Sequence, residues 1–269
     1  GCTFRNCTAT TPVVNIALNS TTAGNSNDFA WIGCTFSNPG IQHNHVFVWM
    51  SQYIAFVGNS FSGGNADPLL HHYIYPTDAE IGTVRGNYFG AATSMSYCLN
   101  TNCKSGTGLV TRWWDVSQNR FSGALYGVDF SNTNNGATNG HFDEFRIADN
   151  AFGGTARHPI FGYNVIGLHV HRNRFWNVNG TNDTHVVLTN NSPDLDLDMQ
   201  DNFGHHNSSG GGMWSNDCVA PVGTVTNNTH VQAGTGYSMR DRLGGGTITY
   251  EDNHYRNTNT NIMYDLAAS

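Results

Sequence analysis

The sequence is poor in charge, and basic residues are especially scarce. Of 269 residues, 12 are Lys or Arg and 19 are Asp or Glu, which gives a formal net charge of −7. Lys104 is the single lysine. A surface that binds nucleic acid needs a stripe of basic side chains, and this composition does not supply one. We therefore expect no nucleic-acid partner.

Long apolar runs and paired-cysteine motifs are also missing. No apolar stretch reaches the roughly 18 residues of a membrane-spanning helix, so we expect no membrane span. No CxxC motif occurs among the six cysteines, which argues against a structural zinc site. The spacing of Cys98 and Cys103 suits a small disulfide, and Cys2 and Cys34 share a GCTF motif that would align them as thiols or as a disulfide. Disulfides would favour an extracellular location.

The sequence does contain one motif many times: an alternating apolar run followed by Asn, any residue, and Phe. Clear copies end at residues 58–61, 86–89, 118–121, 149–152 and 172–175, and weaker ones lie at 30–36, 198–203, 224–230 and 249–255. The spacing varies from 23 residues, between Asn150 and Asn173, to 32 residues, between Asn87 and Asn119. A period in this range predicts stacked supersecondary units.

Apolar residues alternate along the segment before each Asn. The position three residues before it, or before Cys34 in the weaker second copy, holds Trp31, Phe56, Val84, Val116, Ile147, Val170, Met199, Val225 and Tyr250. The position five residues before it is mostly apolar or Gly, from Phe29 to Ile248. A period of two predicts strands with one buried face. Because each repeat is too short to bury that face alone, we expect parallel strands stacked about 4.8 Å apart.

The Asn and Phe residues each have a predicted role. Asn tolerates a left-handed backbone where the chain turns, and its amide can pair with the Asn of the next repeat. The Phe two residues later is expected to stack inside the coil. After Asn202 the aromatic residue, Phe203, comes one position early, which we interpret as a deletion directly after the turn.

These repeats resemble the parallel β-helix of the pectate-lyase-like superfamily and of phage tailspikes, over nearly the whole chain. The resemblance implies an all-β fold, a single-stranded right-handed parallel β-helix of about ten rungs, with an Asn ladder and a Phe stack. We expect residues 1–269 to form one such domain without its natural N-terminal cap, because the chain begins within a repeat. The alternative is a β-sandwich or β-propeller, which would need hairpin signals between the strands.

The outward positions of the same strands predict a functional site. Ionisable residues occupy one outward position in four consecutive repeats, where neighbouring side chains are about 5 Å apart. Carboxylates beside Arg and His can shift one another's pKa and share acid and base roles. The predicted catalytic residues are Asp115, Glu144, Arg146, His169, Asp196 and Asp198. The alternative is a solvated face on which opposite charges alternate.

The resemblance implies a polysaccharide substrate without naming the reaction. A hydrolase would use Asp196 or Asp198 as acid and Asp115 or Glu144 as base. A lyase would neutralise a uronate with arginines and take the proton with a histidine. The residues expected to bind the glycan are Arg85, Trp113, His171 and Trp214, since tryptophan faces suit a pyranose ring. The motifs of polygalacturonases and alginate epimerases are missing, so hydrolase and lyase both stay open.

A metal is predicted only as an alternative. The acidic run at 193–201 could hold Ca²⁺ through Asp194, Asp196 and Asp198, because alternate strand residues project to the same side. Otherwise we expect no metal and no cofactor. Histidines such as His185 and His206 are interpreted as rim or turn residues.

Two functions therefore follow from the sequence. The first is an extracellular polysaccharide-degrading enzyme that binds a glycan chain along the outer face of the central rungs. The second is a non-catalytic β-helix that binds a glycan or receptor or serves a structural role, as in a tailspike or adhesin. Either would be a monomer or a homotrimer with a polysaccharide partner.

Overall fold

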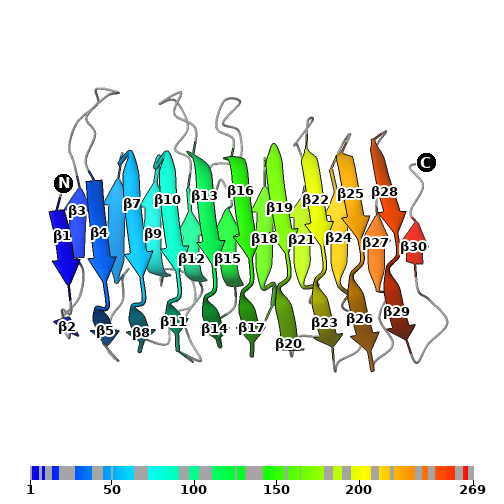
Figure 1. Cartoon of the computed structure of the whole chain (residues 1–269), viewed down its shortest axis with the longest axis horizontal. Helices are drawn as coiled ribbons and strands as arrows, with labels where there is room; N and C mark the ends of the chain where they lie inside the picture. The colour runs from blue at the N-terminus through cyan, green and yellow to red at the C-terminus, as the bar shows by residue number, and fades with distance from the viewer. Residues whose placement is uncertain are drawn as a thin grey trace.

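In the computed structural model, the regular secondary structure of the described residues consists of β-strands, which wind into a long coil. It describes residues 2–5, 8–9, 14–17, 28–37, 45–49, 51–63, 72–90, 97–102, 111–124, 126–130, 142–154, 157–163, 165–178, 184–189, 195–206, 212–218, 221–233, 238–241, 246–257 and 263–265. Every third strand belongs to the same sheet, so the chain visits three ten-stranded sheets in turn (Figure 1). Within these ranges we find no helix that is long and apolar enough to cross a membrane.

The three sheets run along the long axis of the molecule. Sheet A contains β1 (Cys2–Arg5), β4 (Asp28–Ile32), β7 (Tyr53–Val57), β10 (Ile81–Arg85), β13 (Thr111–Ser117), β16 (Phe142–Ala148), β19 (Gly167–His171), β22 (Asp196–Gln200), β25 (Val222–Thr226) and β28 (Thr247–Glu251). Sheet B contains β2 (Thr8–Ala9), β5 (Thr35–Ser37), β8 (Ser60–Ser62), β11 (Tyr88–Phe89), β14 (Arg120–Ser122), β17 (Ala151–Gly153), β20 (Arg174–Val178), β23 (Phe203–His206), β26 (Thr229–Gln232) and β29 (His254–Asn257). Sheet C contains β3 (Val14–Ala17), β6 (Val46–Trp49), β9 (His72–Thr77), β12 (Tyr97–Thr101), β15 (Tyr126–Phe130), β18 (Ile160–Tyr163), β21 (Val186–Thr189), β24 (Trp214–Asp217), β27 (Met239–Asp241) and β30 (Met263–Asp265).

The pairing is parallel between neighbouring strands, as in β4 with β7, β14 with β17 and β21 with β24. This topology confirms the predicted all-β parallel β-helix and is incompatible with the hairpin-linked strands of a sandwich or propeller. The first and last strands, β1 and β30, lie at opposite ends of the coil (Figure 1).

The core consists of the residues that the alternation predicted to face inward. From Trp31 to Val225, the residue three positions before each turn Asn, or before Cys34 in the case of Trp31, is at most 1% exposed. The predicted Phe stack is also present: Phe89, Phe121 and Phe152 stack with ring centroids 4.8 Å and 4.6 Å apart. Each rung thus buries its apolar face against its neighbours, which is where a stacked coil gains most of its stability.

The turn asparagines form the predicted ladder. Asn119 donates its backbone N–H and its side-chain amide to Oδ1 of Asn150, at 2.9 Å and 3.0 Å. The same two bonds join Asn150 to Asn173. The Asn150 amide also donates to the carbonyl of Val116 at 2.8 Å. The ladder therefore satisfies polar groups that the tight turn would otherwise leave buried and unpaired.

The left-handed residue of the turn is not the Asn, contrary to the prediction. It is the residue before it, with φ of 57° at Gln118, 59° at Asp149 and 53° at Arg172. In the earlier turns this position is Gly, as at Gly58 with φ of 63°. The Asn is selected by its amide bonds, and the preceding residue absorbs the bend.

The interpretation of Phe203 as evidence for a deletion after the turn is wrong. Phe203 pairs with Arg174 and Gly204 pairs with Phe175, so the register continues unbroken through the turn. The irregularity comes later, between Phe175 and Val178. Phe203 faces outward and is 44% exposed.

Three further expectations about individual residues are corrected. His185 and His206 are not rim residues, since both are fully buried. In the register of β1 and β4, Cys2 lies opposite Phe29, so it is not aligned with Cys34. Cys98 is a buried free thiol rather than half of a disulfide. Its expected partner, Cys103, lies outside the described residues.

Candidate functional site

The predicted site residues lie on the outer face of sheet A. The strand register aligns Asp115 with Arg146, Arg146 with His169, and His169 with Asp198. These four side chains therefore occupy adjacent outward positions on β13, β16, β19 and β22, as the repeat alignment predicted.

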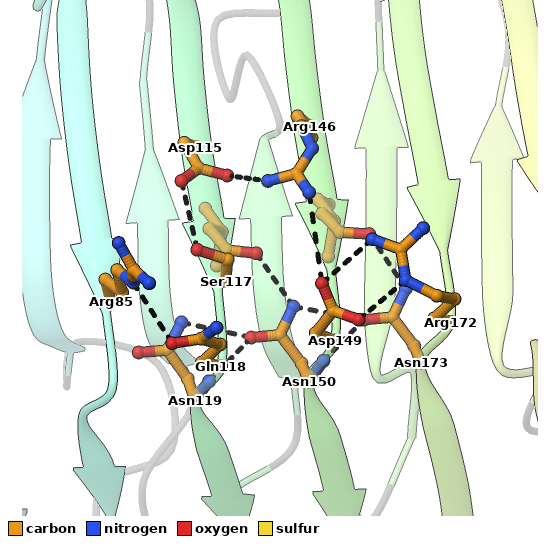
Figure 2. A network of polar contacts seen from close by, with 12 residues as sticks. Arg85, Asp115, Ser117, Gln118, Asn119, Arg146, Asp149, Asn150, Arg172 and Asn173 are labelled. Atoms are coloured by element: carbon orange, nitrogen blue, oxygen red, sulfur yellow. Dashed lines mark hydrogen bonds and ion pairs between the residues drawn. The ribbon is translucent and has the colours of Figure 1, made fainter.

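The first half of this row is a ladder of ion pairs, shown in Figure 2. Arg146 Nη1 lies 2.5 Å from Oδ1 of Asp115, and Ser117 donates to the other oxygen of Asp115 at 3.0 Å. Arg146 also lies 3.9 Å from Asp149, which accepts two hydrogen bonds from Arg172 at 2.8 Å and 2.9 Å. The hydrogen bond from Arg172 is the main reason that the pKa of Asp149 lies below its usual value.

The pairing of charges supports the solvated-face interpretation for this part of the row. The Asp149 and Arg172 side chains are 36% and 49% exposed, so each ion pair contributes little to stability. Neither residue was predicted from the sequence, because both occupy turn positions rather than strand positions. The signal available was a charged residue directly before a turn Asn.

The second half of the row is a cluster of His169, His171 and Asp198, here called the His–Asp cluster. Asp198 Oδ2 lies 2.8 Å from His171 Nε2 and 3.4 Å from His169 Nδ1. Gln200 donates to the other oxygen, Oδ1, at 2.5 Å. Partial burial raises the pKa of Asp198, but the hydrogen bond from Gln200 and the two histidines outweigh it and lower the pKa overall. An ionised Asp198 suits the role of acceptor or ligand better than that of a general acid.

Glu144, beside this cluster, and Trp113, on the strand before that of Glu144 in sheet A, have an unusual backbone. Both have left-handed φ angles, 54° at Glu144 and 59° at Trp113, inside strands β16 and β13. Bulky residues avoid this region, and such strain concentrates at functional sites. Glu144 Oε2 lies 3.6 Å from Nε2 of His169. Trp113 is 49% exposed, and the guanidinium of Arg112 lies 4.2 Å from its ring centroid.

Three of the predicted site residues lie apart from these contacts. Arg85 donates to Gln118 at 3.0 Å on the outer face (Figure 2). Asp196 is exposed, and its partner on β19 is Gly167, which offers no side chain. The prediction that Trp214 binds glycan is wrong: Trp214 belongs to β24 of sheet C and is fully buried in the core.

The acidic run at residues 193–201, predicted as an alternative Ca²⁺ site, is a poor match to the oxygen ligands that Ca²⁺ prefers. Asp194 lies outside the described residues. Both oxygens of Asp198 face nitrogen groups, from His169, His171 and Gln200. The arrangement combines imidazole with carboxylate.

A shallow hollow of about 560 Å³ lies on the same outer face, nearer the N-terminal end of the coil. Ala30, Ala55 and Thr83 occupy adjacent outward positions in its wall. Asp28 and Tyr53 pair across β4 and β7, and Tyr53 is 49% exposed. Small residues flanked by an exposed aromatic ring give this hollow the character of a binding surface. This hollow was not predicted from the sequence, because Ala and Thr carry no chemical signal.

Comparisons with known proteins give one structural similarity. No protein-family model matches the chain, and no curated protein is significantly similar to it in sequence. Among solved structures, it is similar to the crystal structure of PfbA, a surface adhesin of Streptococcus pneumoniae, with a TM-score of 0.48 and 11% sequence identity. The match covers 89% of this chain and spans 63% of the adhesin chain. We draw no functional conclusion from a similarity of this size.

Proposed function

We propose that this chain is a non-catalytic β-helix that binds a glycan on the outer face of sheet A, in the hollow between β1 and β10. The observation that carries this proposal is the lining of the hollow. The ring of Tyr53 offers a face for stacking against the apolar side of a sugar. Asp28 and Thr83 supply groups that bond sugar hydroxyls, and Ala30 and Ala55 leave room for the ring to approach the sheet.

The shape of the site also favours binding over cleavage. The hollow is open and lies along a straight row of strands, which suits an extended chain better than a small enclosed ligand. Among the described residues that line it, Asp28 is the sole carboxylate, whereas glycoside hydrolysis requires two. A glycan-binding function implies an extracellular location, where such partners are displayed.

A second candidate function is polysaccharide cleavage at Glu144 and His169. The specific observation in its favour is the left-handed backbone of Trp113 and Glu144, which holds an aromatic ring and a carboxylate outward at a conformational cost. In a hydrolase, Glu144 would act as base. In a lyase, His169 would accept the proton while Arg146 neutralised a uronate. The catalytic roles of Asp115, Asp196 and Asp198 belong to this same candidate.

A glycan-binding screen followed by matched variants tests the proposal. We expect Tyr53→Ala to weaken binding roughly tenfold, which corresponds to the loss of one stacked ring. Tyr88→Ala is the control, because Tyr88 is 42% exposed but lies on sheet B outside the hollow. Equal effects of the two substitutions would contradict the proposed site.

Each bound glycan is then incubated with the protein to separate the two functions. Binding without new reducing ends supports the binding module. New reducing ends without ultraviolet absorbance indicate a hydrolase, and reducing ends with the absorbance of an unsaturated product indicate a lyase. Cleavage that disappears in Glu144→Gln but persists in Tyr53→Ala would replace the proposal with the second candidate.

A further inference from the structure

We propose that His169, His171 and Asp198 bind a divalent first-row transition metal ion, for which Zn²⁺ is the probe. This inference does not depend on glycan binding. The three side chains offer one ligand atom each, and these atoms lie within 4.8 Å of one another. They come from adjacent strands, β19 and β22, so the rigid sheet fixes the positions of their backbones.

The geometry is close to that of a metal centre. Ligand atoms bound to Zn²⁺ at roughly 2.0–2.2 Å in a tetrahedral site are about 3.3–3.6 Å from each other. Asp198 Oδ2 lies 3.4 Å from His169 Nδ1 and 2.8 Å from His171 Nε2. Metal binding would move the closer pair, His171 and Asp198, apart by roughly 0.5–0.8 Å.

Two further residues hold the ligands in position. Gln200 donates to Oδ1 of Asp198, which leaves Oδ2 turned toward the histidines. Glu144 Oε2 lies 3.6 Å from Nε2 of His169, on the side of the ring away from the metal position, and a small rotation would bring it into hydrogen-bond range. A carboxylate behind a ligating histidine fixes its tautomer and raises its basicity, which is the usual outer shell of such sites.

The ligand types select the class of metal. Two imidazoles and one carboxylate suit Zn²⁺ and its first-row neighbours, whereas Ca²⁺ and Mg²⁺ prefer oxygen ligands. The side chains of His169, His171 and Asp198 are 38%, 19% and 27% exposed. The remaining coordination positions therefore face solvent and can take water or an oxygen atom of a bound partner.

Calorimetric titration of the full, untagged chain after chelator treatment tests the site. We expect one Zn²⁺ per chain, and binding that is lost in His169→Ala and in His171→Ala. Glu144→Gln and Gln200→Ala should weaken binding 10- to 100-fold while retaining the stoichiometry, because they remove positioning residues rather than ligands. His254→Ala is the matched control, since His254 is an exposed histidine on sheet B.

Co²⁺ provides a second readout that does not depend on affinity alone. The wild-type chain should give the visible absorption of Co²⁺ bound by nitrogen and oxygen ligands, and His171→Ala should not. Circular dichroism of each variant checks that the coil is intact. Absence of Zn²⁺ binding in the wild type, or equal binding in the wild type and His171→Ala, would overturn the proposal.

Discussion

The imidazole of His185 lies over Gly204, at the point where the phenylalanine stack of the core ends. A Cβ atom added to Gly204 would lie 2.6 Å from Nδ1 of His185, so the glycine is what makes room for the ring. His185 stacks on Phe175 with centroids 5.1 Å apart, and the ring of His230 lies 5.4 Å beyond it. Histidines thus continue the core where the phenylalanines stop.

These buried histidines predict acid sensitivity. Burial, and then repulsion from His206 and His205, lowers the pKa of His230 from 6.5 to about 3. Between those pH values the unfolded chain binds a proton at this residue and the folded chain does not, so stability falls as pH falls. For one such histidine, the free energy of unfolding should fall by about 1.4 kcal/mol for each unit that the pH falls in this range. Burial lowers the pKa of His185 in the same direction and adds to the effect.

Urea unfolding between about pH 7 and about pH 4 measures this dependence. Carboxylates also titrate near the lower end, so the comparison of variants isolates the histidine. In His230→Leu, the slope of the unfolding free energy against pH should decrease by the contribution of one histidine. In His254→Gln, at an exposed position, the slope should equal that of the wild type. A wild type and a His230→Leu variant with parallel pH profiles would contradict neutral burial of His230.

A pair of phenylalanines tests the assignment of inward and outward positions. Phe121→Ala should cost roughly 3–5 kcal/mol, because it opens a cavity in the middle of the stack. Phe203→Ala should change stability by no more than about 0.5 kcal/mol, since its side chain is 44% exposed. Denaturant unfolding gives both values. Similar losses in the two variants would restore the deletion interpretation that the register rejects.

The Asn ladder predicts a large effect from a small side chain. Asn150→Ala would leave the backbone N–H of Asn119 and the carbonyl of Val116 buried without these partners. Each such group costs about 1–3 kcal/mol, so we expect a loss of about 3 kcal/mol. Thr249→Ala, at an exposed position near the end of the coil, serves as the control and should be nearly neutral. A loss below about 1 kcal/mol for Asn150→Ala would show that water or a relaxed turn replaces the ladder bonds.

The fold was predictable because the turn Asn marks the same point of every rung. Once the motif is aligned, the alternation gives the inward positions of each sheet A strand, which lie three and five residues before the Asn. It also gives the outward row of sheet A that ends at Asp198. The same anchor fixes sheet B only as far as Phe, two residues later. After Asn202 that position is Gly204, and the prediction failed there because it followed the aromatic residue, Phe203, instead of the spacing from the Asn.

The number of residues between sheet B and sheet C varies from repeat to repeat, so the anchor gives no register for sheet C. This is why Trp214 was mistaken for a sugar-binding residue and His185 for a rim residue, although both are core. The His–Asp cluster was predictable as a row of neighbours. Its use as a metal site was not, because the distances among ring nitrogens and carboxylate oxygens depend on side-chain rotation that the repeat does not encode.

The last prediction concerns the backbone of Glu144, whose φ of 54° favours glycine. A side chain in the left-handed region costs roughly 1–2 kcal/mol, and glycine avoids this cost. Glu144→Gly should therefore be about 1 kcal/mol more stable than Glu144→Ala, since both variants lose the carboxylate and only alanine keeps the strained Cβ. Urea unfolding of the two variants gives the difference directly.

Both variants should weaken Zn²⁺ binding to a similar extent, because each removes the carboxylate behind His169. A more stable chain with a weaker metal site would mean that Glu144 is retained for its carboxylate at the expense of stability, as functional residues often are. Alanine and glycine variants of equal stability would show that the left-handed turn at this position carries no strain. The contact of Glu144 with His169 would then be the one remaining indication of its function.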